Sequence, residues 1–134
     1  MRVVIRRGDL FMVKLGLDSR DREISRPVLV IQNDIGNRFC NSIIVVPLSH
    51  TLRAKRLFFA VLINRSGQNG LQKDHVALFS QIRTLDKTCF SNDNYLGRLS
   101  PEIMQKVDTA IELSLGLSTL QKLQNRSYLQ KQTS

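Results

Sequence analysis

The sequence predicts a mainly β fold of the α+β class, in which a small curled antiparallel sheet or barrel is followed by one C-terminal α-helix. Three observations predict it. Short segments rich in Val, Ile and Phe dominate the first two thirds of the chain, turn-forming residues separate them, and the hydrophobic period becomes helical near residue 100. The length of 134 residues fits one ordinary domain.

Five apolar segments are predicted to form strands. Each has the length of a strand and is rich in β-branched or aromatic residues. The connections at 33–36, 64–67 and 69–70 contain Asn and Gly, which favour turns. Connections of this length join antiparallel neighbours more readily than helical crossovers do. In chain order, the predicted strands are residues 9–15, 27–31, 42–46, 57–63 and 75–82.

Residues 100–116 carry the signals of an α-helix. Ser100 is a natural N-cap, Pro101 fits the first turn, and Gly116 can end the helix in a left-handed conformation. A curled sheet in a small domain needs a cover, so the apolar stripe of this helix is expected to pack on the sheet. The stripe consists of Met104, Val107, Ile111 and Leu115, joined by Ile103, Ala110 and Ser114.

The folded domain is expected to span residues 1–117, and residues 118–134 are expected to form a tail that extends the helix or is disordered. No apolar run approaches the roughly 20 residues that cross a bilayer, so no membrane association is expected. The N-terminus lacks the apolar region of a secretory signal, which predicts a cytoplasmic protein.

Cysteine and histidine are scarce. The chain has two cysteines without C-x-x-C spacing, which predicts free thiols rather than a disulfide framework or a zinc site. His50 and His75 are its two histidines, so a His-rich metal site is excluded. We therefore expect no metal and no other cofactor.

The charge is strongly positive and uneven. The formal net charge is +9, and residues 1–65 carry 12 Lys or Arg against 5 Asp or Glu, whereas residues 66–134 carry 8 against 6. A basic surface of this kind attracts polyanions such as nucleic acid. The alternative, a basic surface that only keeps the protein soluble, remains open at this point.

Polar residues gather at the ends of the predicted strands, where a rigid scaffold commonly displays binding groups. Arginine offers a fork of donors for phosphate, and Asn and Gln can pair with base edges. The sequence has no Gly-rich phosphate loop, no G-x-S-x-G motif and no marked carboxylate pair. Each of these polar residues alone also suits an ordinary surface loop. They are Arg26, Asn33, Asn37, Arg38, Ser49, His50, Gln81, Arg83 and Thr84.

Several separated motifs together resemble the MazF/PemK family of toxin endoribonucleases from type II toxin-antitoxin systems. The resemblance covers roughly residues 6–117. It implies a homodimer whose fold is a curled antiparallel sheet of the CcdB/PemK type, an SH3-like barrel, with a C-terminal helix. The matching motifs are RGDLF at 7–11, RPVLVIQNDIGNRF at 26–39, IVVPLS at 44–49, QIRTLDK at 81–87, and the helical pattern at 106–116.

The resemblance implies a sequence-specific mRNA interferase, which cleaves single-stranded RNA without metal and leaves a 2′,3′-cyclic phosphate and a 5′-OH. It also implies an acidic MazE-like antitoxin as partner. The catalytic arginine of the family falls on Arg26, and its hydroxyl residue, usually Thr, falls on Ser49. Family positions that line the RNA channel fall on Asn33, Asn37, Arg38, Gln81, Arg83 and Thr84.

The chain departs from the family pattern in two places. The loop at 18–25 is more charged and about one residue shorter than the common G-S-E-Q-x-G loop, which leaves the cleaved sequence open. Serine at position 49 keeps the hydroxyl but loses a methyl, so its hydrogen bond is retained while its rotamer is less restrained. The basic residues Arg53, Lys55 and Arg56 are candidates for nonspecific phosphate contacts, or form a solvated basic loop.

The residues that transfer protons are not identified by the sequence. Arginine, with a pKa above about 12, is a poor general base. His50 adjoins Ser49, but consecutive strand residues face opposite sides, so His50 is expected to point away from a site that Ser49 enters. His75, at a strand start, is the weaker alternative.

Two other functions remain open on the same fold. One is a noncatalytic toxin that inhibits DNA gyrase, as in the CcdB type, and the other is a retired toxin whose surface only binds a partner.

Overall fold

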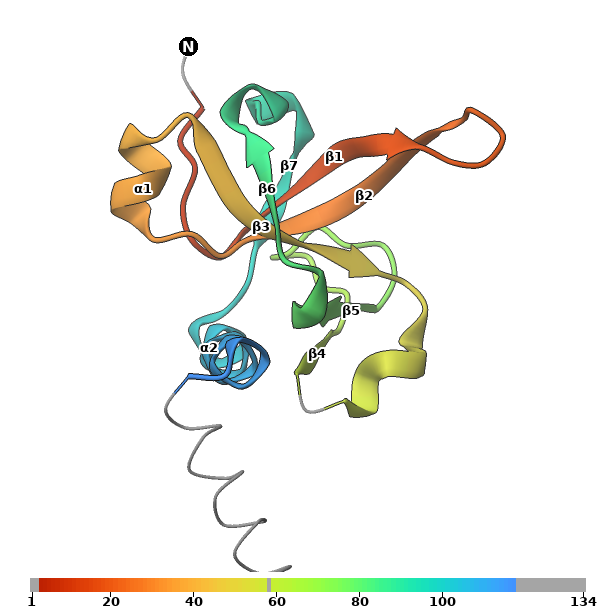
Figure 1. Cartoon of the computed structure of the whole chain (residues 1–134), viewed down its shortest axis with the longest axis vertical. Coiled ribbons are helices and arrows are strands. Elements are labelled where there is room, and N and C mark those ends of the chain that lie inside the picture. Colours follow the sequence, from red (N-terminus) through yellow and green to blue (C-terminus); the bar gives the residue numbers. More distant parts are fainter. Residues whose placement is uncertain (1–2, 58, 118–134) are drawn as a thin grey trace, which may run out of the picture.

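The computed structural model describes residues 3–57 and 59–117, apart from the side chains of residues 54 and 55. The described part forms one seven-stranded sheet with two α-helices (Figure 1). This confirms the predicted mainly β fold with a C-terminal helix, whereas the predicted tail at 118–134 lies outside the described residues. The elements are β1 Asp9–Leu17, β2 Glu23–Val30, α1 Asp34–Phe39, β3 Ser42–Ser49, β4 Ala60–Ile63, β5 His75–Leu78, β6 Arg83–Asp86, β7 Tyr95–Arg98 and α2 Pro101–Leu115.

Strand β3 joins two parts of the sheet. The strand order is β4-β5-β3-β2-β1-β7, β6 also pairs with β3, and every pairing is antiparallel. One edge of β3 pairs with β2 through residues 45–47, and the other pairs first with β6 and then, at Leu48 and Ser49, with β5. Because β3 changes partner along its length, the sheet curls, and β4 and β5 lie below the long β1–β2 hairpin in Figure 1.

Both faces of the central strands are buried. Side chains alternate along β2, so Leu29 enters one apolar core while Val28 and Val30 enter a second core on the opposite face. The first core is closed by Val107 and Ala110 of α2, as the helical stripe predicts. This packing holds β2 and β3 in fixed positions relative to each other.

The ends of α2 follow the predicted signals. The Ser100 hydroxyl accepts a hydrogen bond from the Ile103 N–H at 3.3 Å, Pro101 occupies the first turn, and Gly116 ends the helix with a φ of 70°. The Ser114 hydroxyl donates to the Phe79 carbonyl at 2.6 Å, which ties the helix to the segment after β5. Within the described residues, no helix is long and apolar enough to span a membrane.

Some predicted boundaries are wrong. The segment 33–36 is the start of α1 rather than a turn, because the Asn33 side chain accepts from the Gly36 N–H at 2.8 Å and caps the helix. The predicted strand at 75–82 ends at Leu78, since a 3-10 turn over Phe79–Gln81 directs Phe79 into the first core. The strands β6 and β7 are not among the five predicted segments.

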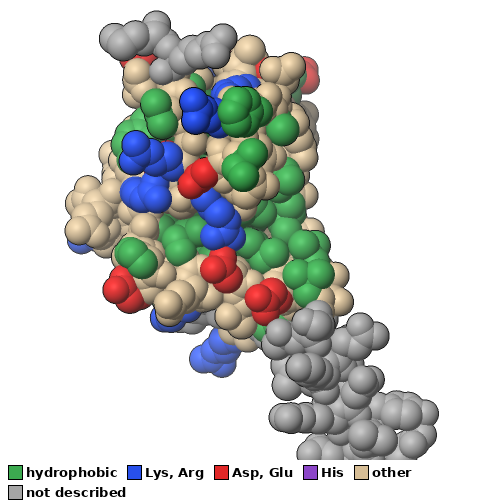
Figure 2. All heavy atoms as spheres, turned by 90° about the vertical axis from the view of Figure 1, so that its left-hand side faces the viewer, with side chains coloured by type: hydrophobic (Ala, Val, Ile, Leu, Met, Phe, Trp, Pro, Cys, Tyr) green, Lys and Arg blue, Asp and Glu red, His purple; other side chains and the backbone are tan. Residues whose placement is uncertain are grey.

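The face that carries α1 combines apolar and charged side chains. Figure 2 shows Lys and Arg side chains lying among apolar ones on this face, with acidic side chains nearby. Helix α1 itself has two exposed apolar side chains, Ile35, which is 75% exposed, and Phe39, which is 73% exposed. The positive charge is therefore interrupted here by carboxylates and apolar groups.

Candidate functional site

A cleft of about 520 Å³ contains both Arg26 and Ser49. In the pairing of β2 with β3, Val30 lies opposite Val45 and Val28 lies opposite Pro47, and the observed pairing ends at Val28 and Pro47. Continued by two residues, the same register would set Arg26 opposite Ser49, so both residues lie where the two strands separate. The apolar residues that line the cleft are Met12, Ile24, Pro27, Leu48, Leu71 and Leu96.

Arg26 presents an unpaired cation to this cleft. It lies in β2 opposite Val13 of β1, and its side chain is exposed. Within the described part of the chain, its guanidinium has no hydrogen bond and no ion pair. The donor fork is therefore available to an anionic ligand.

Ser49 presents a hydroxyl whose oxygen is already engaged. It is the last residue of β3 and pairs with Val76 of β5. Its Oγ accepts a hydrogen bond from the Thr51 N–H at 3.1 Å. Because a hydroxyl has one proton to donate, Ser49 can direct that proton at a ligand in the cleft while the backbone holds its oxygen.

Both histidines line the same cleft. In the pairing of β3 with β5, Ser49 lies opposite Val76, so the next residue in the same register, His50, lies opposite His75. The centroids of the two imidazole rings are 6.4 Å apart. The expectation that His50 points away from the site is wrong. Strand β3 ends at Ser49 and His50 lies in the following bend, so strand alternation no longer decides its direction.

His75 is held more firmly than His50. Its side chain is buried, with 9% of the residue exposed. Its Nδ1 lies 2.8 Å from the Lys73 carbonyl oxygen, which can only accept, so Nδ1 carries a proton and donates it. In the neutral ring the lone pair is then on Nε2.

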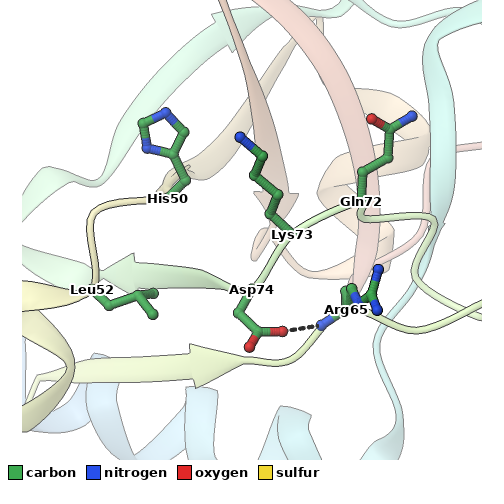
Figure 3. Close-up of a pocket in the computed structure, with 6 residues that line it drawn as sticks. All are labelled: His50, Leu52, Arg65, Gln72, Lys73 and Asp74. Carbon is green, nitrogen blue, oxygen red and sulfur yellow. Dashed lines mark hydrogen bonds between the residues drawn. The ribbon is translucent and has the colours of Figure 1, made fainter.

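A second hollow of about 550 Å³ continues the cleft (Figure 3). His50, Gln72 and Lys73 line both spaces, and Figure 3 shows these three side chains pointing to the same side. Arg65 and Asp74 line this second hollow but not the cleft. The Asp74 carboxylate accepts a hydrogen bond from the Arg65 backbone N–H at 2.8 Å. The two spaces adjoin at these shared residues, and we refer to them together as the trough, of which Arg26 lines one part and Arg65 lines the other.

A glycine shapes the wall of this trough. Gly70 lines the cleft with a φ of 70°, and a Cβ at this position would collide with the Leu96 carbonyl of β7. Only glycine permits this close approach. The connection between β4 and β5 is thereby held against β7, which brings Gln72 and Lys73 to the rim.

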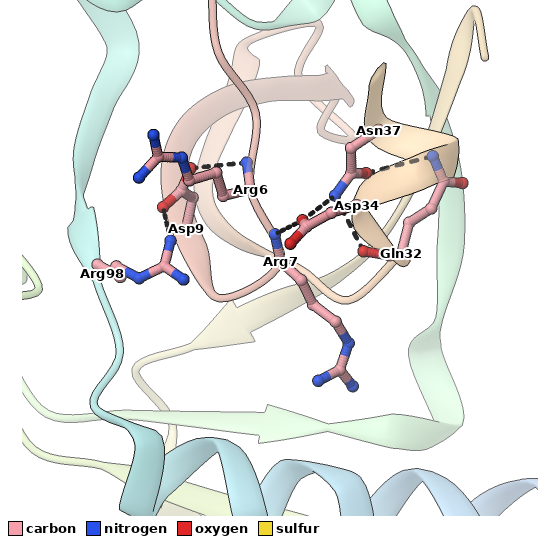
Figure 4. Close-up of polar contacts among 7 residues, drawn as sticks. All are labelled: Arg6, Arg7, Asp9, Gln32, Asp34, Asn37 and Arg98. Atoms are coloured by element: carbon pink, nitrogen blue, oxygen red, sulfur yellow. Dashed lines mark hydrogen bonds and ion pairs between the residues drawn. The ribbon is translucent and has the colours of Figure 1, made fainter. Parts of the chain in front are cut away.

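The residues of α1 occupy a different hollow, of about 1150 Å³. Asn37 is 1% exposed, and its amide donates to the Gln32 carbonyl at 2.9 Å and to the Asp34 carboxylate at 3.2 Å (Figure 4). Its oxygen accepts from Gln32 Nε2 at 3.2 Å. Arg38 is exposed in the same hollow, 5.2 Å from the centre of the Phe39 ring. Asn37 and Arg38 are thus not brought into the Arg26–Ser49 cleft.

The Asp34 carboxylate organises this second region. It accepts from the Arg7 backbone N–H at 2.7 Å, and this hydrogen bond is the main reason that the pKa of Asp34 lies below its ordinary value of 3.8. Arg7 also pairs with Asp108 of α2 at 2.7 Å. Figure 4 shows the resulting row of contacts, which fastens the segment before β1 to α1.

The other residues predicted for RNA contact lie outside the cleft. Gln81 ends a 3-10 turn, and Arg83 and Thr84 pair with Val45 and Ile44 on the other edge of β3. These three side chains are exposed, as are Asn33, Arg53 and Arg56, whereas the side chain of Lys55 is not described.

Gln72, Lys73 and Arg65 line these spaces but are not among the residues predicted from the sequence. The Gln-Lys-Asp run at 72–74 directly precedes β5, as Arg26 directly precedes the predicted strand at 27–31. That position is an equally good signal, because the start of one antiparallel strand lies beside the end of its neighbour.

No described group of three or more His, Cys, Asp or Glu side chains is arranged to hold a metal ion. Cys40 and Cys89 are free and exposed.

Comparison with known proteins gives consistent matches. Residues 6–115 match the model of the PemK-like, MazF-like toxins of type II toxin-antitoxin systems. Endoribonuclease EndoA of Bacillus subtilis is 37% identical over 116 residues, which cover 86% of this chain and 97% of that protein. Endoribonuclease MazF of Staphylococcus saprophyticus is 36% identical over 118 residues, covering 87% and 96% of the two chains.

Among solved structures, a mycobacterial endoribonuclease in complex with its cognate antitoxin has the same fold. The TM-score is 0.68 at 27% identity, and the match covers 84% of this chain and 96% of that one.

Proposed function

The chain belongs to the PemK-like, MazF-like toxin family, and from this premise we propose that it cleaves single-stranded RNA at specific sequences and without metal. The observation that supports this proposal best is that one cleft is lined by both Arg26, whose guanidinium has no partner among the described residues, and Ser49, whose hydroxyl proton is available. A chain could belong to the family and still have these two residues far apart. In this chain Arg26 and Ser49 line the same cleft.

In this proposal Arg26 binds the scissile phosphate. The 2′-oxygen of the preceding ribose attacks phosphorus, and negative charge grows on the nonbridging oxygens as the new bond forms. A planar guanidinium can donate two hydrogen bonds to such oxygens, and it stabilises them most where charge is greatest. Ser49 adds one further hydrogen bond to a phosphate oxygen.

The bond to the 5′-oxygen breaks as the 2′-oxygen bond forms. The products are therefore a 2′,3′-cyclic phosphate and a 5′-OH, because the attacking nucleophile belongs to the RNA itself. The protein orients the attacking oxygen in line and neutralises charge, as catalysis by positioning requires.

The RNA strand follows the trough away from the scissile phosphate in this proposal. Lys73 and Arg65 suit phosphates, and Gln72 suits a base edge. Single-stranded RNA extends over several nucleotides, so contacts beyond the trough are also proposed. They are Asn33, Arg38, Gln81, Arg83 and Thr84, with Arg53, Lys55 and Arg56 as nonspecific phosphate contacts, whereas Asn37 would have to release its own hydrogen bonds.

We further propose a homodimer in the cytoplasm that is neutralised by an acidic, MazE-like antitoxin. The net charge of +9 favours an acidic peptide, which can occupy a phosphate trough in place of RNA. The mycobacterial relative forms a complex with its cognate antitoxin, which supports a partner of this class.

One assay tests the proposed activity. Purified protein is incubated with a long RNA in EDTA, and the 5′ ends are mapped and tested for direct phosphorylation by a kinase. We expect cuts at a recurrent sequence with free 5′-OH ends. Intact RNA would contradict the nuclease, and intact RNA together with inhibited DNA supercoiling would favour a gyrase poison.

A further inference from the structure

The two histidines of the cleft have no assigned role in the chemistry above. Arg26 and Ser49 supply charge and hydrogen bonds, but the 2′-OH must lose a proton and the departing 5′-oxygen must gain one. Arginine cannot exchange protons readily near neutral pH, whereas imidazole can. His50 and His75 are the two imidazoles of the chain, and both line the cleft that contains Arg26 and Ser49.

The spacing of the rings suits two separate proton transfers. Their centroids are 6.4 Å apart and their planes are inclined by 40°, so they are not stacked. In an in-line displacement, the attacking and leaving oxygens lie on opposite sides of phosphorus. Two imidazoles beside one phosphate site can therefore serve the two oxygens at once.

The surroundings of each ring indicate which transfer it performs. His75 is buried, and its Nδ1 proton is committed to the Lys73 carbonyl, which leaves Nε2 as a fixed proton acceptor. His50 is exposed in the bend after β3, where solvent can reprotonate it. This arrangement favours His75 as the base and His50 as the acid.

We propose that His75 and His50 are the general base and the general acid of RNA cleavage, an inference that rests on the proposed function. Nε2 of His75 takes the proton of the 2′-OH while the 2′-oxygen bonds to phosphorus. The bond from phosphorus to the 5′-oxygen breaks, and the His50 imidazolium gives its proton to that oxygen. His75 then releases its proton to water and His50 regains one, which restores both rings.

The charged groups around the two rings come from strand β2 and from the connection between β4 and β5. Arg26 of β2 lines the cleft, Lys73 from the connection before β5 lines both parts of the trough, and Arg65 with Asp74 lines the part next to His50. Any change in the pH dependence must therefore be measured with these four residues intact, so the test alters the histidines alone.

The first experiment measures single-turnover cleavage as a function of pH. The base must be neutral and the acid protonated, so the wild-type rate should rise and then fall with pH. His75→Asn keeps an amide proton for the Lys73 carbonyl but has no acceptor at the Nε2 position. We expect it to lose the rising limb, and His50→Ala to lose the falling limb, each with a rate loss of about 10²–10⁴-fold near neutral pH.

A substrate with a sulfur leaving group separates acid catalysis from binding. RNA with a 5′-bridging sulfur at the cut site expels a thiolate, which needs no proton. His50→Ala should cut this substrate at nearly the wild-type rate, while His75→Asn should remain slow on it. His50→Gln keeps a hydrogen-bond donor without proton transfer, so it should be as slow as His50→Ala on ordinary RNA.

Folding and binding are checked with thermal unfolding and with the affinity for RNA carrying a 2′-deoxy residue at the cut site. Lys106→Ala, an exposed change on α2, is the matched surface control. If the wild type cuts RNA and both folded histidine variants keep its rate and pH profile, the inference is wrong and the proposed function stands. If the wild type cuts no RNA, the proposed function itself fails.

Discussion

The Arg26–Ser49 cleft and the hollow beside α1 use similar residues in opposite ways. The run 26–39 supplies both regions, with Arg26 at one end and Asn37 near the other. In the cleft, the described structure leaves the guanidinium unpaired and the Ser49 proton available. Beside α1, the Asn37 amide and the Asp34 carboxylate bond to their neighbours. One motif thus supplies an end whose donors are free in the described structure and an end whose polar groups stabilise the fold.

The largest expected effect is on catalysis at the cleft. Arg26→Ala removes a cation with no partner in the described chain, so folding stability should hardly change. Cleavage should fall by about 10³–10⁵-fold, the range seen when a phosphoryl-transfer arginine is removed. Single-turnover rates and thermal unfolding of the same preparation measure both quantities. A folded variant that cuts RNA at the parental rate would show that Arg26 does not bind the reacting phosphate.

Ser49→Ala should have the next largest effect. It removes one directed donor, which typically reduces the rate by about 10²–10³-fold. Ser49→Thr is the matched control, because it keeps the hydroxyl and adds a methyl that restrains the rotamer. We expect it to retain activity in the same assay. Equal losses in both variants would indicate that the packing at this position matters rather than its hydroxyl.

The sequence predicted local features better than distant ones. The Ser100 cap and the Gly116 terminus depend on neighbours in the chain, and both are confirmed. A strand is also found where residues 27–31 predicted one, although β2 begins four residues earlier, at Glu23. Lys73 reaches the cleft because β3 pairs with β5 and because the connection before β5 packs against β7, and the local sequence does not say which strands pair. The same pairing makes His75 a neighbour of His50.

Two errors have a common cause. The direction of His50 was predicted from strand alternation, but the alternation ends one residue earlier, at Ser49. The segment 33–36 was predicted as a turn because Asn and Gly favour turns, yet here Asn33 caps a helix. In both cases the position of an element's end decides the outcome, and element ends are the least determined by local sequence.

In the hollow beside α1, substitution of Asn37 is expected to reduce the stability of the fold. Asn37→Ala leaves the Gln32 carbonyl without its amide donor in a buried site, which should reduce the free energy of unfolding by about 1–3 kcal/mol. Asn33→Ala is the control, since it removes only an exposed helix cap worth about 1 kcal/mol. Denaturant unfolding compares the two. If Asn37→Ala unfolds like the wild type but binds RNA more weakly, Asn37 is a base contact instead.

The smallest expected effect is a change in the pH dependence of folding stability when Asp34, beside α1, is replaced. The pKa of Asp34 is lowered below 3.8, chiefly because the Arg7 backbone N–H donates to its carboxylate. A lowered pKa in the folded state means that the ionised carboxylate stabilises the fold above its unfolded-state pKa, and that this contribution is lost as the pH falls through the folded-state pKa. Asp34→Asn keeps an acceptor for the same donor but has no charge. The variant should therefore be slightly less stable than the wild type near neutral pH, and the difference should vanish in acid well below pH 3.8. Unfolding by urea across this range measures it, and a difference that persists unchanged in acid would mean that the shape of the side chain, rather than its charge, holds the segment before β1 against α1.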